Sequence, residues 1–253
     1  MQHRPKRSLG QNFLRDAVIA DRIVAALDLE NDEKVIEIGP GQGALTQRLL
    51  DEGARVVAVE LDRRFAAELR VRFRADSFEL IEIDALDVRF ADVVDRPSVK
   101  LVANLPYNIS TPILQRLSEQ REVFSGLVLM FQREVVERIT ASPGGKERGF
   151  LSVVAQNAFE IEYLFDVPPK AFYPVPKVWS AVVRLTPKPH ADDEGSLRDL
   201  VSKSFIQKRK TLANNLSHRY PDIAAILQDI GFPPKVRAEE LTLDEWRRLL
   251  DVL

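Results

Sequence analysis

Residues 34–51 read KVIEIGPGQGALTQRLLD, which is a short apolar run, a glycine-rich loop and an amphipathic segment. We expect a strand at Lys34–Ile38, a loop at 39–43 and a helix that runs to about Asp51. Glycines at such a loop admit positive φ angles and let the backbone approach a ligand closely. The stretch therefore predicts a β-loop-α unit of the kind that binds nucleotides and nucleosides, although NAD and FAD folds use similar loops.

The alternation of strand and helix continues beyond this unit. Further strands are expected at Arg55–Val59, Glu79–Ile83, Val99–Ala103 and Leu127–Phe131, with helices at 16–29, from 62 to about 73 and at 109–120. Such alternation predicts a parallel sheet with helices on both faces. Two later strands, Ile161–Val167 and Val178–Leu185, are expected to form an antiparallel hairpin at the sheet edge. The segment between them, residues 168–176, holds four prolines and must be a rigid loop.

A linker-like stretch, residues 187–195, separates this pattern from a helical remainder. The remaining apolar periodicity predicts helices at Leu197–Phe205, Thr211–Leu216, Ile223–Ile230 and Leu243–Leu250. We therefore expect an α/β domain over residues 1–187 and a small all-α C-terminal domain over residues 188–253.

Composition narrows the function classes. The chain of 253 residues has no cysteine and only three histidines, scattered along its length, which excludes thiolate chemistry and argues against a histidine metal site. No apolar run reaches the ~18 residues of a membrane span, and no signal peptide is visible, so a cytoplasmic protein without membrane contact is expected. The net charge is −2, but Arg4, Lys6, Arg7 and Arg15 near the start and a cluster over 203–210 are compatible with docking onto RNA.

Acidic and polar residues follow the expected strands, at the edge where open α/β sheets bind ligands. Glu60 follows the second strand, where the ribose hydroxyls of a bound nucleoside lie, and Asp84 follows the third, where it can accept from an adenine amino group. The short glycine spacing of residues 39–43 and the proline inside the loop favour S-adenosylmethionine over a dinucleotide.

Residues 104–107 read NLPY and follow the fourth expected strand. The amino group on a flat base is a poor nucleophile, because its lone pair is delocalised into the ring. The Asn104 side-chain oxygen and the Leu105 carbonyl could accept its two N–H bonds, so that the nitrogen becomes more tetrahedral as it attacks. Pro106 would stiffen the turn, and the Tyr107 ring could stack on the base. Together these residues predict methyl transfer to an amino group, whereas the tetrapeptide alone would be compatible with an ordinary turn.

Four segments together resemble the ribosomal RNA adenine dimethyltransferases. They are residues 8–14, SLGQNFL, residues 37–43, EIGPGQG, residues 104–111, NLPYNIST, and residues 172–180, FYPVPKVWS. The resemblance spans about residues 7–217. Residues 205–216, FIQKRKTLANNL, are most similar to the start of the C-terminal domain in the bacterial small-subunit branch, although the first residues depart slightly from its pattern.

The resemblance implies a class I methyltransferase fold and a function in ribosome biogenesis. The expected reaction dimethylates the N6 amino groups of two adjacent adenosines near the 3′ end of small-subunit ribosomal RNA. S-adenosylmethionine would be the cofactor, S-adenosylhomocysteine the product, and no metal would take part. The expected partner is a precursor of the small ribosomal subunit with its RNA; DNA is not expected, and the protein should be a monomer.

The resemblance also implies roles for individual residues. The cofactor set is Asn12, Leu14, Gly39, Gly41, Glu60, Asp84, Ala85 and Asn104, and the catalytic set is Asn104, Leu105, Pro106, Tyr107 and Phe172. Tyr107 and Phe172 are expected to sandwich the flipped target adenine.

Three alternatives remain open from the residues. Relatives of the macrolide-resistance type methylate large-subunit RNA, a DNA adenine methyltransferase would share the cofactor pocket, and a ribosome-assembly factor on this fold could act without catalysis. A DNA enzyme would need a larger recognition region than residues 188–253. The intact Gly39, Glu60 and Asn104 argue against a purely non-catalytic protein.

Overall fold

The computed structural model describes residues 10–74, 76–95 and 98–253, which form two compact units. The first contains the described residues up to Val136 together with Phe159–Pro187, and the second contains Glu137–Ala158 and Lys188–Leu253. The chain passes from the first unit to the second at Lys188, where the domain boundary was expected. Residues 137–158 differ from the prediction, which assigned them to the first domain. They belong to the second because Val153 is buried in the core of that unit.

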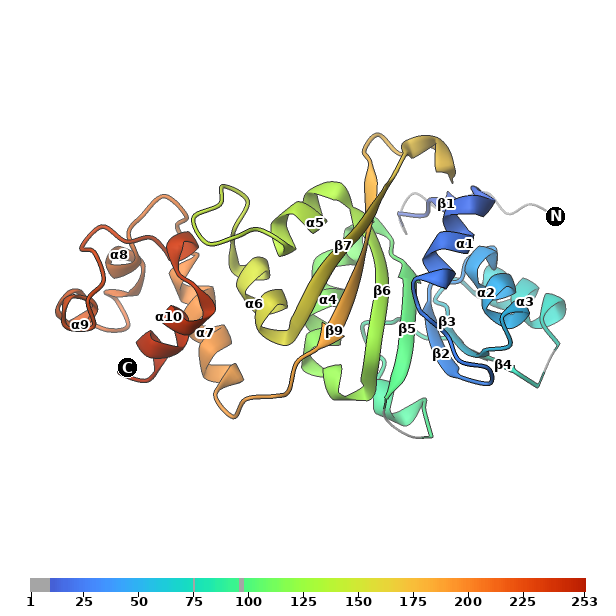
Figure 1. Cartoon of the computed structure of the whole chain (residues 1–253), viewed down its shortest axis with the longest axis horizontal. Helices are drawn as coiled ribbons and strands as arrows, with labels where there is room; N and C mark the ends of the chain where they lie inside the picture. The colour runs from blue at the N-terminus through green and yellow to red at the C-terminus, as the bar shows by residue number, and fades with distance from the viewer. Residues whose placement is uncertain (1–9, 75, 96–97) are drawn as a thin grey trace. The chain divides into compact units, whose positions relative to one another are not determined.

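A seven-stranded mixed sheet forms the centre of the first unit, in the order β4-β3-β2-β5-β6-β9-β7 (Figure 1). Its strands are β2 (Lys34–Ile38), β3 (Arg55–Val59), β4 (Phe78–Ile81), β5 (Val99–Asn104), β6 (Phe124–Gln132), β7 (Phe159–Val167) and β9 (Ser180–Pro187). The strands from β4 to β6 are parallel, whereas β9 is antiparallel to both β6 and β7. The α/β class and the hairpin at the sheet edge are therefore confirmed.

The helices of the first unit alternate with its strands along the chain. They are α1 (Ala17–Ala25), α2 (Ala44–Asp51), α3 (Arg63–Arg72) and α4 (Ser110–Glu119), and α5 (Arg133–Ile139) begins in this unit. Asp16 caps α1 by accepting the Ile19 N–H at 3.2 Å. Helix α2 begins directly after Gly43, whose φ of 75° suits glycine. The core between α1, α2 and the sheet holds fully buried residues such as Val35, Leu49 and Val56.

Two very short strands form a separate sheet that sequence periodicity did not predict. Strand β1 (Phe13–Leu14) pairs antiparallel with β8 (Phe172–Tyr173). The Arg15 N–H extends the connection by donating to the Ala171 carbonyl at 2.8 Å. This ladder ties the N-terminal segment to the proline-rich loop.

The second unit is helical. Its helices are α6 (Phe150–Ala158), α7 (Glu194–Ser204), α8 (Leu212–Leu216), α9 (Ile223–Asp229) and α10 (Leu243–Leu250). They enclose a core around the fully buried Trp246. Thr242 begins α10 with a capping box, in which its hydroxyl accepts the Glu245 N–H at 3.2 Å. Within the described residues, no helix is long and apolar enough to cross a membrane.

Candidate active site

A pocket opens at the carboxyl ends of the parallel strands β2 to β5, where open α/β sheets bind ligands. Eleven of the predicted site residues line it: Asn12, Leu14, Gly39, Gly41, Glu60, Asp84, Ala85, Asn104, Leu105, Pro106 and Tyr107. They come from the N-terminal segment, from the turns after β2, β3 and β4, and from the 104–107 stretch at the end of β5. The structure thus brings together residues that are up to 95 positions apart in the chain.

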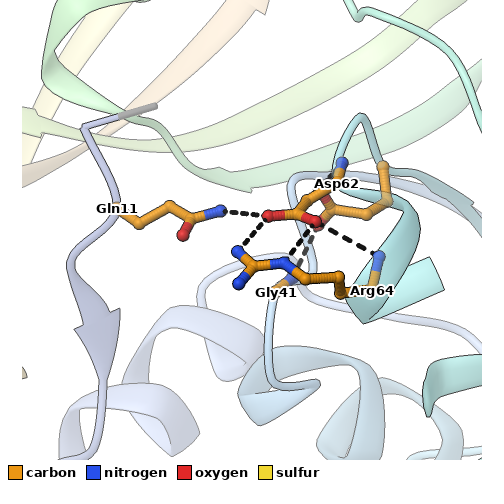
Figure 2. Close-up of polar contacts among 5 residues, drawn as sticks. Gln11, Gly41, Asp62 and Arg64 are labelled. Atoms are coloured by element: carbon orange, nitrogen blue, oxygen red, sulfur yellow. Dashed lines mark hydrogen bonds and ion pairs between the residues drawn. The ribbon is translucent and has the colours of Figure 1, made fainter. Parts of the chain in front are cut away.

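The N-terminal segment, residues 10–14, forms one wall of this pocket. The Gln11 amide donates to the Asp62 carboxylate at 3.2 Å, and Arg64 donates to the same carboxylate at 2.7 Å (Figure 2). The Arg64 guanidinium holds the pKa of this buried carboxyl well below its usual range. Asp62 is therefore a permanent anion that holds the segment against the start of α3. The basic residues Arg4, Lys6 and Arg7 and the motif residues Ser8 and Leu9 lie outside the described residues.

Glu60 fixes the backbone of the glycine-rich loop. One Glu60 oxygen accepts the Gly41 N–H at 3.0 Å, and the other accepts the Asp62 N–H at 2.8 Å. Burial raises the pKa of Glu60, and these N–H donors oppose that rise. Gly41 has a φ of 55°, and a side chain there would meet the Phe13 ring at 3.0 Å. Glu60 therefore shapes the loop as well as facing the pocket.

Glu37 is a second acid of the pocket, and it is only 1% exposed. It accepts a hydrogen bond from the Thr46 hydroxyl at 2.6 Å. Burial, with the nearby Glu60 charge, raises the pKa of Glu37 to about 7, and the Thr46 hydrogen bond opposes the rise. Two buried acids, Glu37 and Glu60, inside one partly apolar pocket favour a ligand that carries positive charge.

Asp84 and Ala85 lie beyond β4 on the pocket wall. The Asp84 carboxylate accepts the Leu86 N–H at 2.9 Å, which fixes the turn, and Ala85 is buried at the wall. A carboxylate beside a buried apolar side chain has the chemistry that an adenine ring requires.

The 104–107 stretch closes the pocket from the side of β5. The Asn104 amide nitrogen donates to the Asn12 carbonyl at 3.2 Å, which orients the side chain. Since the nitrogen uses one of its two N–H groups in that bond, the Asn104 oxygen remains available as an acceptor for a ligand. The Leu105 N–H donates to the Met130 carbonyl at 3.3 Å, which ties the turn to β6.

Tyr107 is half-buried, and its hydroxyl lies 3.0 Å from the Ser180 hydroxyl. Ser180 is the first residue of β9 and is fully buried. Burial raises the pKa of the Tyr107 phenol, and the Ser180 hydrogen bond opposes this rise. The ring is therefore neutral at physiological pH and is fixed at its tip.

Phe172 differs from its predicted place. It was expected to form one face of a base sandwich, but it is 3% exposed, packs in the core with residues of α1, and does not line the pocket. The reason is the β1–β8 ladder, in which Phe172 pairs with Leu14. In this structure the pocket therefore has one of the two predicted rings, Tyr107.

The residues present fit S-adenosylmethionine. Two acids can balance the positive charge of the cofactor, the open backbone at Gly39 leaves space beside the pocket, and Asp84 with Ala85 suits a purine. Among the described residues there is no group of three or more side chains able to hold a metal ion.

Glu37, Ser180 and the Gln11–Asp62–Arg64 cluster had no predicted role. Glu37 had a usable signal, because it is an acid inside an otherwise apolar strand. Ser180 and Gln11 lie inside segments that carry the family resemblance, but no local pattern indicates their contacts, since their partners are 73 and 51 residues away in the chain.

This sheet, with a cofactor-type pocket at the ends of its parallel strands, defines a class I methyltransferase. The family model described as ribosomal RNA adenine dimethylase matches residues 2–253. The chain belongs to this family.

Curated relatives cover the whole chain. It is 44% identical to "Ribosomal RNA small subunit methyltransferase A" of Syntrophotalea carbinolica, over 100% of this chain and 98% of that protein. It is also 44% identical to the protein of the same name from Pseudomonas aeruginosa, over 100% and 96%.

Two solved structures share the fold at 27% identity. The dimethyladenosine transferase from Plasmodium falciparum has a TM-score of 0.74 and covers 93% of this chain and 95% of that one. The 23S rRNA methyltransferase ErmE has a TM-score of 0.72, with 95% and 98% covered. The fold is therefore shared with a dimethyladenosine transferase and with a 23S rRNA methyltransferase.

Proposed function

We propose that this methyltransferase dimethylates the N6 amino groups of two adjacent adenosines near the 3′ end of small-subunit ribosomal RNA. It would act as a monomer in the cytoplasm on a precursor of the small subunit. Relatives that are 42–45% identical and named for the small subunit support this substrate. The observation that carries the chemistry is the Asn104 side chain, oriented by the Asn12 carbonyl on the wall of a pocket that fits a methyl donor.

The proposed roles follow from this geometry. When bound, S-adenosylmethionine supplies a methyl group on a positively charged sulfur. The Asn104 oxygen and the Leu105 carbonyl accept the N–H bonds of the target amine, which directs the nitrogen lone pair toward that methyl group. Tyr107 stacks on the base and holds it in place. Catalysis then comes from positioning and electrostatics. No general base is required, because the methylated nitrogen is ammonium-like and loses its proton to water.

The cofactor roles are also proposals. Glu60 holds the Gly41 backbone and faces the ribose, Asp84 and Ala85 contact the adenine, and the 10–14 segment covers the methionine part. Because Gln11 and Asn12 hold that segment to Asp62 and Asn104, cofactor binding and base positioning share one wall.

Ser180 positions the Tyr107 ring, and this role has a testable consequence. We expect Ser180→Ala to slow methyl transfer by roughly 3- to 10-fold, the size of one lost hydrogen bond. Tyr107→Phe removes the same bond and should cost about as much, because the ring remains. The double variant should be no slower than either single variant. Steady-state rates of the two single variants and the double variant, all stably folded, measure this. If the losses of the two single variants added up in the double variant, Ser180 would not act through Tyr107.

A basic turn in the second unit is the proposed RNA-backbone contact. It comprises residues 206–210, and its Lys208, Arg209 and Lys210 are exposed. The Asn215 side chain holds the turn by bonding both the N–H and the carbonyl of Gln207, at 3.1 and 3.2 Å. Lys203 extends the basic cluster but pairs with Asp199.

Replacing Lys208, Arg209 and Lys210 with alanine should weaken subunit binding and flatten its salt dependence. Each lost phosphate contact should lower the salt slope by about 1. Lys235→Ala, an exposed lysine of the same unit, is the matched control. Binding measured from low to high salt checks this, and an unchanged slope would exclude the turn from RNA contact.

Transfer of labelled methyl to undermethylated small subunits tests the function, with large subunits and duplex DNA as parallel substrates. Two dimethylated adenosines on small-subunit RNA are expected. Label on large-subunit RNA would instead assign the specificity named for ErmE. Cofactor binding without transfer to any substrate would favour an assembly factor.

A further inference from the structure

The loop between β8 and β9 presents large apolar side chains to solvent. Within residues 173–179, here called the apolar loop, Tyr173 is 48% exposed, Val175 64%, Val178 39% and Trp179 47%. Pro174 and Pro176 restrict its backbone, so these side chains are displayed on a stiff segment. Several exposed apolar side chains on one short segment mark a candidate interaction surface.

Both ends of the apolar loop are fixed to the wall of the candidate active site. At its start, Tyr173 pairs with Phe13, which lines the pocket. At its end, Trp179 is followed by Ser180, which holds the Tyr107 hydroxyl. A strand of RNA whose target base occupies the pocket therefore has its neighbouring nucleotides within reach of this loop.

The charge around the apolar loop selects the kind of partner. The Arg15 guanidinium lies over the Tyr173 ring, 4.1 Å from its centroid. Lys170 and Lys177 are exposed, and residues 168–180 contain no acid. Flat rings among cations are the surface on which single-stranded bases stack while their phosphates are neutralised. An RNA strand fits this combination better than an apolar protein surface does.

We infer that the apolar loop is a stacking platform for the nucleotide next to the target adenosine, with Trp179 as its main ring. This inference rests on the proposed function and extends it. With two adjacent adenosines as targets, one base is held on Trp179 while the other is in the pocket. The loop thereby contributes to binding of the RNA and leaves the transfer step itself to Asn104 and Tyr107.

The first test is a split between KM and kcat for the full chain on undermethylated small subunits. Trp179→Leu should raise KM for the subunit roughly 5- to 100-fold, the range expected for one lost base stack. The rate at saturating subunit and the affinity for S-adenosylmethionine should stay unchanged, and Trp179→Tyr should restore most of the loss. Val71→Ser, which alters an exposed side chain on α3, is the matched control.

An unchanged KM in Trp179→Leu would overturn the platform, whereas failure of the proposed function would appear as absence of transfer by the wild-type protein.

The second test places a photoreactive amino acid at position 179 or, as control, at position 71. Crosslinking to the target adenosine that adjoins the one in the pocket is expected on the small subunit. Crosslinks to a ribosomal protein, or no more crosslinking than from position 71, would overturn the inference.

Discussion

Asn104→Ala should lower methyl transfer by about 100-fold or more, the cost of losing one preorganised polar group at a reacting centre. Its oxygen is the proposed acceptor for the target amine, and its amide nitrogen already donates to the Asn12 carbonyl. Alanine removes the acceptor and leaves the pocket otherwise open. The affinity for S-adenosylmethionine should change by only a few fold, because Glu37, Glu60 and Asp84 remain. Single-turnover rates and a separate cofactor titration would measure the two effects.

Asn214→Ala is the matched control, since it truncates an exposed asparagine of the second unit. Asn104→Asp is informative as well, because the carboxylate keeps an acceptor but loses the donor to Asn12. It should retain more activity than Asn104→Ala if acceptance is the main role. Near wild-type transfer by Asn104→Ala would make the acceptor model wrong.

The fold was predictable wherever a local pattern was strong. Strands β2 and β3 match their predicted bounds to the residue, because each is an apolar run between polar or glycine residues. Strand β6 extends beyond its predicted bounds to Phe124 and Gln132, since Ser125 and Gly126 interrupt its apolar run. Strand β9 begins two residues later than predicted, because Val178 and Trp179 are apolar but exposed.

Tertiary contacts explain what local patterns missed. The β1–β8 ladder joins two-residue strands, which have no detectable period, and it places Phe172 in the core. Residues 150–158 form α6, and their membership of the second unit depends on which core buries Val153. The pocket itself was predictable, because strand order places the ends of β2 to β5 at one edge.

Glu37→Gln should stabilise the protein at pH 8 and weaken its binding of cofactor. Burial raises the pKa of Glu37 to about 7, from an ordinary value of 4.5. The folded state therefore holds this proton more tightly than the unfolded state does, and stability falls as the pH rises from 4.5 to 7. Above pH 7 the buried charge lowers the free energy of unfolding by its full cost, which is roughly 3 kcal/mol from this difference in pKa.

Glutamine keeps an oxygen for the Thr46 hydroxyl but carries no charge. At pH 8 the variant should gain up to roughly 3 kcal/mol in the free energy of unfolding, and at pH 5 less than about 1 kcal/mol. Urea unfolding at both pH values measures this gain. An equal gain at pH 5 and pH 8 would contradict a titrating Glu37, and Asp51→Asn, which alters a surface acid of α2, is the control.

Glu37 destabilises the folded protein when it is ionised, and a positively charged ligand beside it would offset that cost. The positive charge of S-adenosylmethionine would favour ionised Glu37, so binding near pH 6 should release a proton from this residue. Calorimetry in buffers of different ionisation enthalpy would detect the release, and Glu37→Gln should abolish it. The neutral S-adenosylhomocysteine sulfur should bring less release than the cofactor sulfonium. If both ligands released the same number of protons, the ammonium group that they share would be the partner of Glu37.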